Sequence, residues 1–108
     1  MKTFFDGIFV SKEHLKEAGI NYPIKLEYYR TAREENNGKA RENENSKNEY
    51  GIEIVKTEYR EGIVKVETKE ISNITNNILE QEKILNILRN NEVTPIGVED
   101  VLEDLLKV

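Results

Sequence analysis

The stretch Ile71–Leu106 constrains this chain most, because it holds two amphipathic helical patterns and most of the strong apolar clusters. In the first pattern, residues that recur at about 100° per residue share one stripe. That stripe contains Ile74, Ile78, Gln81, Ile84, Leu85 and Leu88. Leu79 and Ile87 lie off the stripe, which indicates that this helix contacts two neighbours. Asn73 or Thr75 would cap its start.

A Thr-Pro-Ile-Gly break separates this helix from the second pattern. Thr94 and Pro95 suit the cap and the first helical position, since the fixed φ of proline fits a first turn. The apolar face of this second helix would carry Val98, Val101, Leu102, Leu105 and Leu106. Its opposite face would carry Glu99, Asp100, Glu103 and Asp104. The acidic first turn suits the positive end of the helix dipole.

Three segments before the helices show the period-two pattern of β-strands. In Ile24–Arg30, alternation places on one face Ile24, Leu26 and Tyr28. Tyr50–Tyr59 and Ile63–Ile71 form the clearest hairpin, because the intervening Glu61-Gly62 suits a two-residue turn.

The turn sets the register of this hairpin. One face would pair Tyr59 with Val64, Thr57 with Val66 and Val55 with Thr68. The other face would pair Glu58 with Lys65 and Lys56 with Glu67. Opposite charges across strands favour this register by about 0.2–1 kcal/mol each. Ile52 and Ile54 have the opposite parity from Val55, which indicates a bulge near Ile54-Val55 or burial on both sides at that end.

The N-terminal part has the weakest pattern, and we expect residues 1–23 to be a loosely attached segment. Thr3–Val10 could form a short strand, but Asp6-Gly7 interrupts its alternation. Ser11–Gly19 is typical of one short helix, with its serine as N-cap and its glycine as a left-handed stop.

Together these patterns predict an α+β fold: a three-stranded antiparallel β-meander packed against two C-terminal helices, with a short N-terminal helix. The two helices would span Thr75–Asn90 and Pro95–Lys107. Residues 32–48 contain no large apolar side chain and would form a flexible polar hairpin loop. We expect a single domain over residues 1–108, with residues 71–107 as a helical lid.

Composition limits both the core and the partners. Hydrophobic residues are 37% and charged residues 34%, so the core must be small or completed by a partner. The net charge of −5 argues against nucleic acid, whose phosphates need clustered Lys and Arg. No apolar run approaches the roughly 20 residues that span a bilayer, and no signal peptide is expected. The chain has no cysteine, which excludes disulfides and thiolate chemistry and fits a cytoplasmic location.

Few residues carry a signal for chemistry. The single histidine, His14, fits a surface helix better than a metal site or a triad. No phosphate-binding glycine loop, nucleophile elbow or calcium loop is present, so we expect no catalytic residue, metal or cofactor. The acidic cluster at positions 99, 100, 103 and 104 would bind a basic partner or form a solvated helix face. The strand tyrosines could stack bases, but β-propensity explains them more simply.

The order of a short helix, three strands and a longer helix is similar to that of the double-stranded-RNA-binding domain. That fold binds RNA through a lysine-rich start to its last helix. The matching stretch here, Ser72–Asn77, has no basic residue. The similarity is therefore one of element order alone.

Two segments carry a closer resemblance. Tyr50-Gly-Ile-Glu-Ile, followed by a second strand and by Leu88–Leu106, resembles a family of small uncharacterised proteins of clostridial Firmicutes. The most specific parts are Asn91-Glu-Val-Thr-Pro95 and Glu99-Asp-Val-Leu-Glu-Asp104, and the resemblance covers Ile24 to Leu106. That family has no assigned activity, so the resemblance implies no catalytic residue.

The leading functional hypothesis is a small non-enzymatic protein-binding or regulatory domain that self-associates as a homodimer or binds another protein. Surplus apolar surface on the helices motivates it, and the candidate interface residues are Leu79, Ile87, Val101 and Leu105. The alternative is a small ligand-binding protein or enzyme that uses carboxylates and tyrosines on the sheet face. It requires a concave pocket lined by some of the residues Tyr28, Tyr50 and Tyr59. A nucleic-acid adaptor ranks last.

Overall fold

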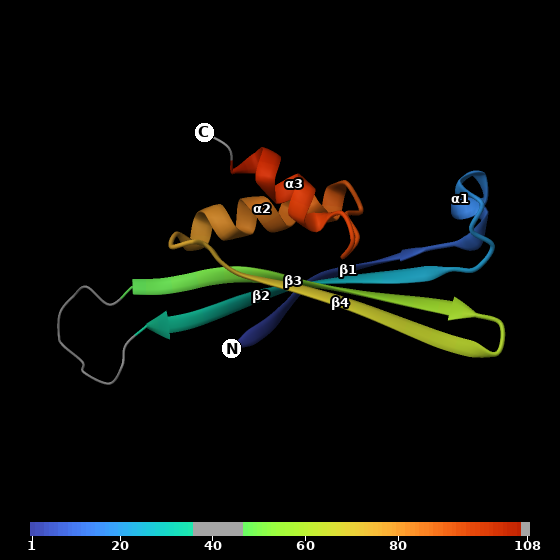
Figure 1. Ribbon diagram of the computed structural model, residues 1–108, viewed down its shortest axis with the longest axis horizontal. Helices are drawn as coiled ribbons and strands as arrows, with labels where there is room; N and C mark the ends of the chain where they lie inside the picture. The colour runs from blue at the N-terminus through green and yellow to red at the C-terminus, as the bar shows by residue number, and fades with distance from the viewer. Residues whose placement is uncertain (36–46, 107–108) are drawn as a thin grey trace.

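The computed structural model describes residues 1–35 and 47–106, and these form an α+β fold with one antiparallel sheet (Figure 1). The sheet has four strands in chain order rather than the three expected. They are β1 (Lys2–Val10), β2 (Ile24–Glu35), β3 (Lys47–Arg60) and β4 (Ile63–Thr75). Both ends of the predicted 32–48 loop are therefore strand, and its residues 36–46 lie outside the described part of the chain.

The unexpected strand is β1, which forms one edge of the sheet. It pairs with β2 along its whole length, but the register shifts between Phe4 and Asp6. The shift is a β-bulge at Phe5, and a bulge changes which face the following residues take. Ile8 and Val10 consequently face the core, whereas the sequence pattern of this segment looks interrupted.

The hairpin of β3 and β4 has the predicted register, including Tyr59 opposite Val64 and Lys56 opposite Glu67. Of the two alternatives for this end of β3, the bulge near Ile54-Val55 is wrong, whereas burial on both sides is found, since Ile52 and Glu53 face opposite sides and both are buried. The register instead shifts between Tyr50 and Ile52, where the Gly51 backbone lies so close to β4 that a Cβ atom would meet the Ile71 carbonyl oxygen at 2.3 Å. Only glycine fits this position without moving backbone.

The short N-terminal helix agrees with its prediction. It consists of α1 (Lys12–Leu15) and the 3₁₀ turn η1 (Lys16–Ala18). The Ser11 side chain accepts a hydrogen bond from the His14 amide, and Gly19 ends the segment with a φ of 80°.

The two C-terminal helices are shorter than predicted. α2 (Ile78–Asn90) is capped by Asn77, whose side-chain oxygen accepts from the Leu79 and Glu80 amides. α3 (Val98–Leu105) begins after Gly97, because the preceding residues form a turn in which the Gly97 amide donates to the Thr94 carbonyl. The predicted caps at Asn73 or Thr75 and at Thr94 are therefore wrong.

Both helices lie on one side of the sheet, and α2 contacts all four strands (Figure 1). The core between them comprises Val10, Ile24, Leu26, Tyr28, Ile52, Ile54, Ile84, Leu85, Leu88, Val93, Val98 and Leu102. Within this core, the fully buried Gln81 side-chain nitrogen donates to the Thr31 and Gly51 carbonyls at 3.0 and 2.7 Å. No helix of the described residues covers the other side of the sheet, which we call the open face.

Candidate functional site

The hairpin end of the open face carries four exposed apolar side chains, which we call the apolar patch. They come from three strands. Phe9 is 62% exposed, Tyr59 37%, Val64 59% and Val66 57%. The Phe9 and Tyr59 ring centroids are 6.4 Å apart, and Tyr59 lies directly opposite Val64. The patch is therefore continuous across the sheet rather than a scatter of single residues.

Strand alternation explains why these side chains face away from the helices. The even-numbered residues of β3 turn toward the helix side, where Ile52 and Ile54 enter the core and Lys56 and Glu58 follow in the same row. The odd-numbered residues, Tyr59 among them, must then lie on the open face.

A charge network occupies the helix side of the same hairpin. The Lys56 ammonium lies 3.1 Å from a Glu58 carboxylate oxygen and 3.4 Å from Glu67, and Arg60 Nε donates to Glu58 at 2.8 Å. Burial acts to raise the pKa of Glu58, but hydrogen bonds from Lys56 and Arg60 outweigh it and lower that pKa. Burial acts to lower the pKa of Lys56, yet its two carboxylate partners raise it overall. Both shifts favour the charged forms of Lys56 and Glu58.

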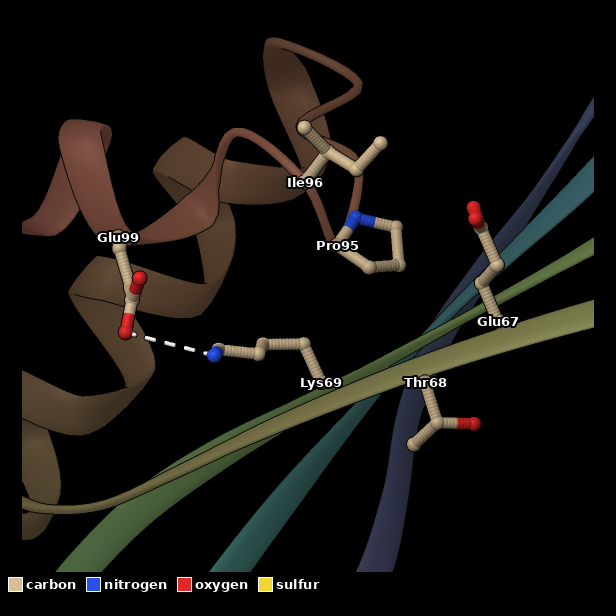
Figure 2. Close-up of a pocket in the computed structure, with 6 residues that line it drawn as sticks. All are labelled: Glu67, Thr68, Lys69, Pro95, Ile96 and Glu99. Atoms are coloured by element: carbon tan, nitrogen blue, oxygen red, sulfur yellow. Dashed lines mark ion pairs between the residues drawn. The ribbon is translucent and has the colours of Figure 1, made fainter.

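A pocket of about 480 Å³ lies at the outer edge of β4, which is the last strand of the sheet. It is lined by Glu67, Thr68, Lys69, Pro95, Ile96 and Glu99. Figure 2 shows Pro95 and Ile96 above the strand and an ion pair between Lys69 and Glu99, whose charged atoms are 3.4 Å apart. Ile96 is 78% exposed, so the pocket has an apolar wall that nothing in the described chain covers.

One buried hydrogen bond fastens the segment that carries this wall. The Tyr28 hydroxyl donates to the Val93 carbonyl at 2.9 Å, deep in the core. Burial, together with the nearby Glu92 charge, raises the pKa of Tyr28 far above its ordinary value, so the hydroxyl stays protonated as a donor. Pro95 and Ile96 follow directly after this anchor.

The predicted interface residues differ in exposure. Leu79 is 74% exposed on the first turn of α2, and Leu105 is 38% exposed at the end of α3. Ile87 and Val101 are half-buried, and Val101 packs against the core. Free apolar surface among these four residues is thus concentrated at Leu79 and Leu105.

The predicted acidic face is on the surface: all four of its carboxylate residues are exposed on α3. Three of them also border a hollow of about 580 Å³ beside the end of β4, lined by Ile71, Ile74, Glu99, Asp100, Leu102, Glu103 and Leu106. Among the described residues, no group of three or more His, Cys, Asp or Glu side chains has the arrangement of a metal site.

The remaining candidates are dispersed. His14 is exposed on α1. Tyr28 is fully buried, Tyr50 is half-buried, and Tyr59 belongs to the apolar patch on the open face. Because Tyr28 and Tyr59 lie on opposite sides of the sheet, these tyrosines share no single pocket.

The sequence patterns overlooked Phe9, and with it the patch. They also left open which face of the hairpin turns outward. The signal lies in the register of β2 and β3, where Tyr28 is opposite Ile54 and Leu26 opposite Lys56. Once the buried face of β2 is known, that register directs Tyr59, Val64 and Val66 outward.

The fold and this surface define the class as a small α+β domain with an uncovered sheet face and an exposed strand edge. Residues 8–108 match the family of unknown function DUF6514, and the chain belongs to that family. The match begins at residue 8, so the expectation that residues 1–23 lie outside the family is wrong for most of that segment. Comparison with curated proteins and with solved structures finds no match.

Among the described residues, no helix combines the length and the apolar character needed to cross a membrane.

Proposed function

We propose that this chain is a non-enzymatic protein-interaction domain that self-associates through its sheet. The observation that carries the proposal is the apolar patch of Phe9, Tyr59, Val64 and Val66, which is continuous and lies on a face that no helix of residues 1–35 and 47–106 covers. Exposed apolar clusters of this kind mark protein contact sites. The absence of cysteine supports a cytoplasmic location as part of the proposal.

The energetic argument is the burial of apolar area. Covering a valine or phenylalanine side chain stabilises a contact by roughly 1.5–3 kcal/mol before the entropic cost of association is subtracted. Several such side chains at one end of the sheet supply what a specific contact needs. Two polar side chains lie in the same row as the patch, Lys25 opposite Phe9 and Thr57 opposite Val66, and a partner would contact them as well.

The experiment is light scattering over a concentration series, with wild type beside two variants. Val66→Lys places a charge in the apolar patch, and Leu79→Asp places one on the helical surface that the sequence favoured. We expect a dimer for wild type, a shift toward monomer for Val66→Lys, and little change for Leu79→Asp. A wild-type monomer at every concentration refutes self-association. Loss of the dimer in Leu79→Asp alone would move the interface to the helices.

A second candidate function is small-ligand binding on the open face. A hollow of about 390 Å³ at the other end of the sheet favours it, because the lining includes Lys2, Arg33, Glu49, Glu53 and Glu70. Lys2 lies 3.3 Å from Glu53, so part of this charge is already satisfied within the chain. We rank this proposal second. A thermal-shift screen against small cationic and anionic metabolites tests it, and no stabilisation by any of them would count against it.

A further inference from the structure

We propose that the partner of this surface is a second copy of the chain, whose β4 pairs antiparallel with the first β4 and places Val66 on the two-fold axis. The inference deepens the self-association proposed above and rests on it. It joins two sheets edge to edge into one continuous sheet, with the residue numbers of each cross-strand pair summing to 132.

The first observation is that β4 is the more regular edge. Sheet edges are normally blunted by proline, bulges, short strands or charged side chains. β1, the other edge, has a bulge at Phe5. From Ile63 to Ile71, β4 pairs with β3 without an irregularity and contains no proline. Its outer hydrogen-bonding groups are thus in a regular row.

The turn fixes which of those groups point outward. In a hairpin with a two-residue turn, the flanking residues form the first hydrogen-bonded pair, and such pairs then alternate. Arg60 and Ile63 flank the Glu61-Gly62 turn. The backbone groups of the odd-numbered residues therefore bond to β3, and those of Val64, Val66 and Thr68 point outward. Self-pairing must match even-numbered with even-numbered residues.

Charge and apolar contact together select among the registers that satisfy this condition. With Val66 on the axis, Lys65 lies opposite Glu67 of the second copy, and this attractive pair occurs twice. Moving the axis to Glu67 sets the two Glu67 side chains opposite each other and Lys65 opposite Lys69. A shift of the axis by one residue thus exchanges attraction for repulsion between closely spaced side chains. An axis at Thr68 would also set Glu67 opposite Lys69, but it would set Val66 opposite Glu70. Among the described residues, Lys65 has no ion pair within its own chain. Glu67 lies 3.4 Å from Lys56 in its own chain, so in the dimer it would be shared between that lysine and Lys65 of the second copy.

The same register fills the edge pocket. It brings Ile63 of the second copy opposite Lys69, on the helix side of the sheet and beneath Pro95 and Ile96. Ile63 is 60% exposed in the single chain, and the pocket has room for its side chain. In Figure 2 this space lies above β4, between Glu67 and the Lys69–Glu99 ion pair.

On the open face, the register joins the two apolar patches. Val66 meets its symmetry copy, and Val64 lies opposite Thr68 of the second chain. In Figure 2, Thr68 points away from the pocket, toward this side. One pairing therefore fills the pocket on the helix side and brings the two Val66 side chains into contact on the open side. Phe9 and Tyr59, on β1 and β3, are not covered by this edge contact. Because both contacts follow from a single two-fold pairing, a second copy fits better than an unrelated strand.

Cysteine scanning tests the register, since the natural chain has no cysteine. A single Cys at residue n links to its copy only if n lies on the axis, because directly paired Cα atoms are about 5.5 Å apart and a disulfide requires 4.4–6.8 Å. We expect Val66→Cys to form a disulfide-linked dimer under mild oxidation. Val64→Cys should link at least about tenfold more slowly, since the two copies would be roughly 13 Å apart.

The outcomes separate the two proposals. Linkage of Thr68→Cys or Glu67→Cys in place of Val66→Cys overturns this register. A wild-type dimer with no linkage at any of these positions overturns the β4 contact but leaves self-association standing. A wild-type monomer refutes both. Circular dichroism of each variant confirms that it is folded.

A charge exchange gives a second test that does not use cysteine. Lys65→Glu alone and Glu67→Lys alone each set like charges against each other at two positions, and each should dimerise about tenfold or more weakly than wild type. In an equimolar mixture of the two variants, both cross-strand pairs again have opposite signs. We expect the mixture to form a heterodimer. If the mixture dimerises no better than either variant alone, the proposed pairing is refuted.

Discussion

Replacing Gln81 with methionine should destabilise the domain more than any other single change that preserves side-chain volume on α2. Gln81 is 1% exposed, and its side-chain nitrogen bridges the carbonyls of Thr31 on β2 and Gly51 on β3. This bridge fixes the helix over the two central strands where the sheet is irregular. Methionine fills the same space but donates no hydrogen bond to either strand.

The magnitude follows from the two lost hydrogen bonds. The buried Gly51 acceptor left without its donor costs about 1–3 kcal/mol and the partly buried Thr31 acceptor about 1 kcal/mol, so the pair should cost about 2–4 kcal/mol. For a chain of this length, that loss lowers the melting temperature by roughly 9–18 °C. A change of this size is a large fraction of the stability of an ordinary domain.

Urea unfolding followed by circular dichroism measures the effect. The matched control is Lys83→Met, an exposed position on the same helix, which should change the free energy of unfolding by less than about 0.5 kcal/mol. If Gln81→Met unfolds within about 0.5 kcal/mol of wild type, the bridge does not hold α2 on the sheet.

Three further changes test the anchors around the candidate site. Tyr28→Phe removes the hydrogen bond to Val93 and should cost about 1–2 kcal/mol in urea unfolding, whereas an unchanged midpoint would show that the anchor is dispensable. Gly51→Ala forces a Cβ atom against backbone and should cost about 1–3 kcal/mol or more, and a stability equal to wild type would refute the close approach. The lowered pKa of Glu58 means that its stabilisation is complete above the ordinary value of 4.5 and is lost as the pH falls through the lower folded value. Glu58→Gln should therefore weaken the acid dependence of unfolding, and equal acid dependence in the two proteins would contradict the network with Lys56.

The parts of the fold that the sequence predicted correctly depend on local patterns. The buried residues of β2 follow from strict alternation, and the register of β3 and β4 follows from a two-residue turn with opposite charges at matching positions. The buried stripe of α2 follows from helical periodicity, since four of its predicted members are buried: Gln81, Ile84, Leu85 and Leu88. Each of these inferences needs only residues close together in the chain.

The incorrect predictions concern parts of the fold whose structure depends on residues far apart in the chain. β1 was missed because the bulge at Phe5 changes the parity that identifies a strand, and pairing with β2 keeps the strand in place despite the bulge. The bulge at Gly51 was misplaced because it depends on the close approach of β4. The late start of α3 follows from the turn at Thr94–Gly97, next to the anchor that Tyr28 provides.

In the candidate site, too, the features that depend on local patterns were predicted, and those that depend on distant residues were not. Leu79 and Leu105 were visible from sequence as surplus apolar surface on helices, and both are exposed. The apolar patch needs Phe9 from β1 beside Tyr59 from β3, and these strands are neighbours of β2 rather than of each other. Such a patch can be recognised only when the order and register of the whole sheet are known.

The sequence of β4 explains how an uncovered edge can remain specific. Lys65, Glu67 and Lys69 alternate in sign along the helix side of the strand, while Val64 and Val66 lie on the open side. A uniformly apolar edge would accept any strand in many registers, and a uniformly charged edge would accept none. Alternating charges make pairing about Val66 attractive and pairing about Glu67 repulsive. Pairing about Thr68 restores opposite charges but sets Val66 opposite Glu70, so the charges and the valines together disfavour a slipped pairing. The charges on the helix side thus make the edge selective, and the valines on the open side strengthen the contact.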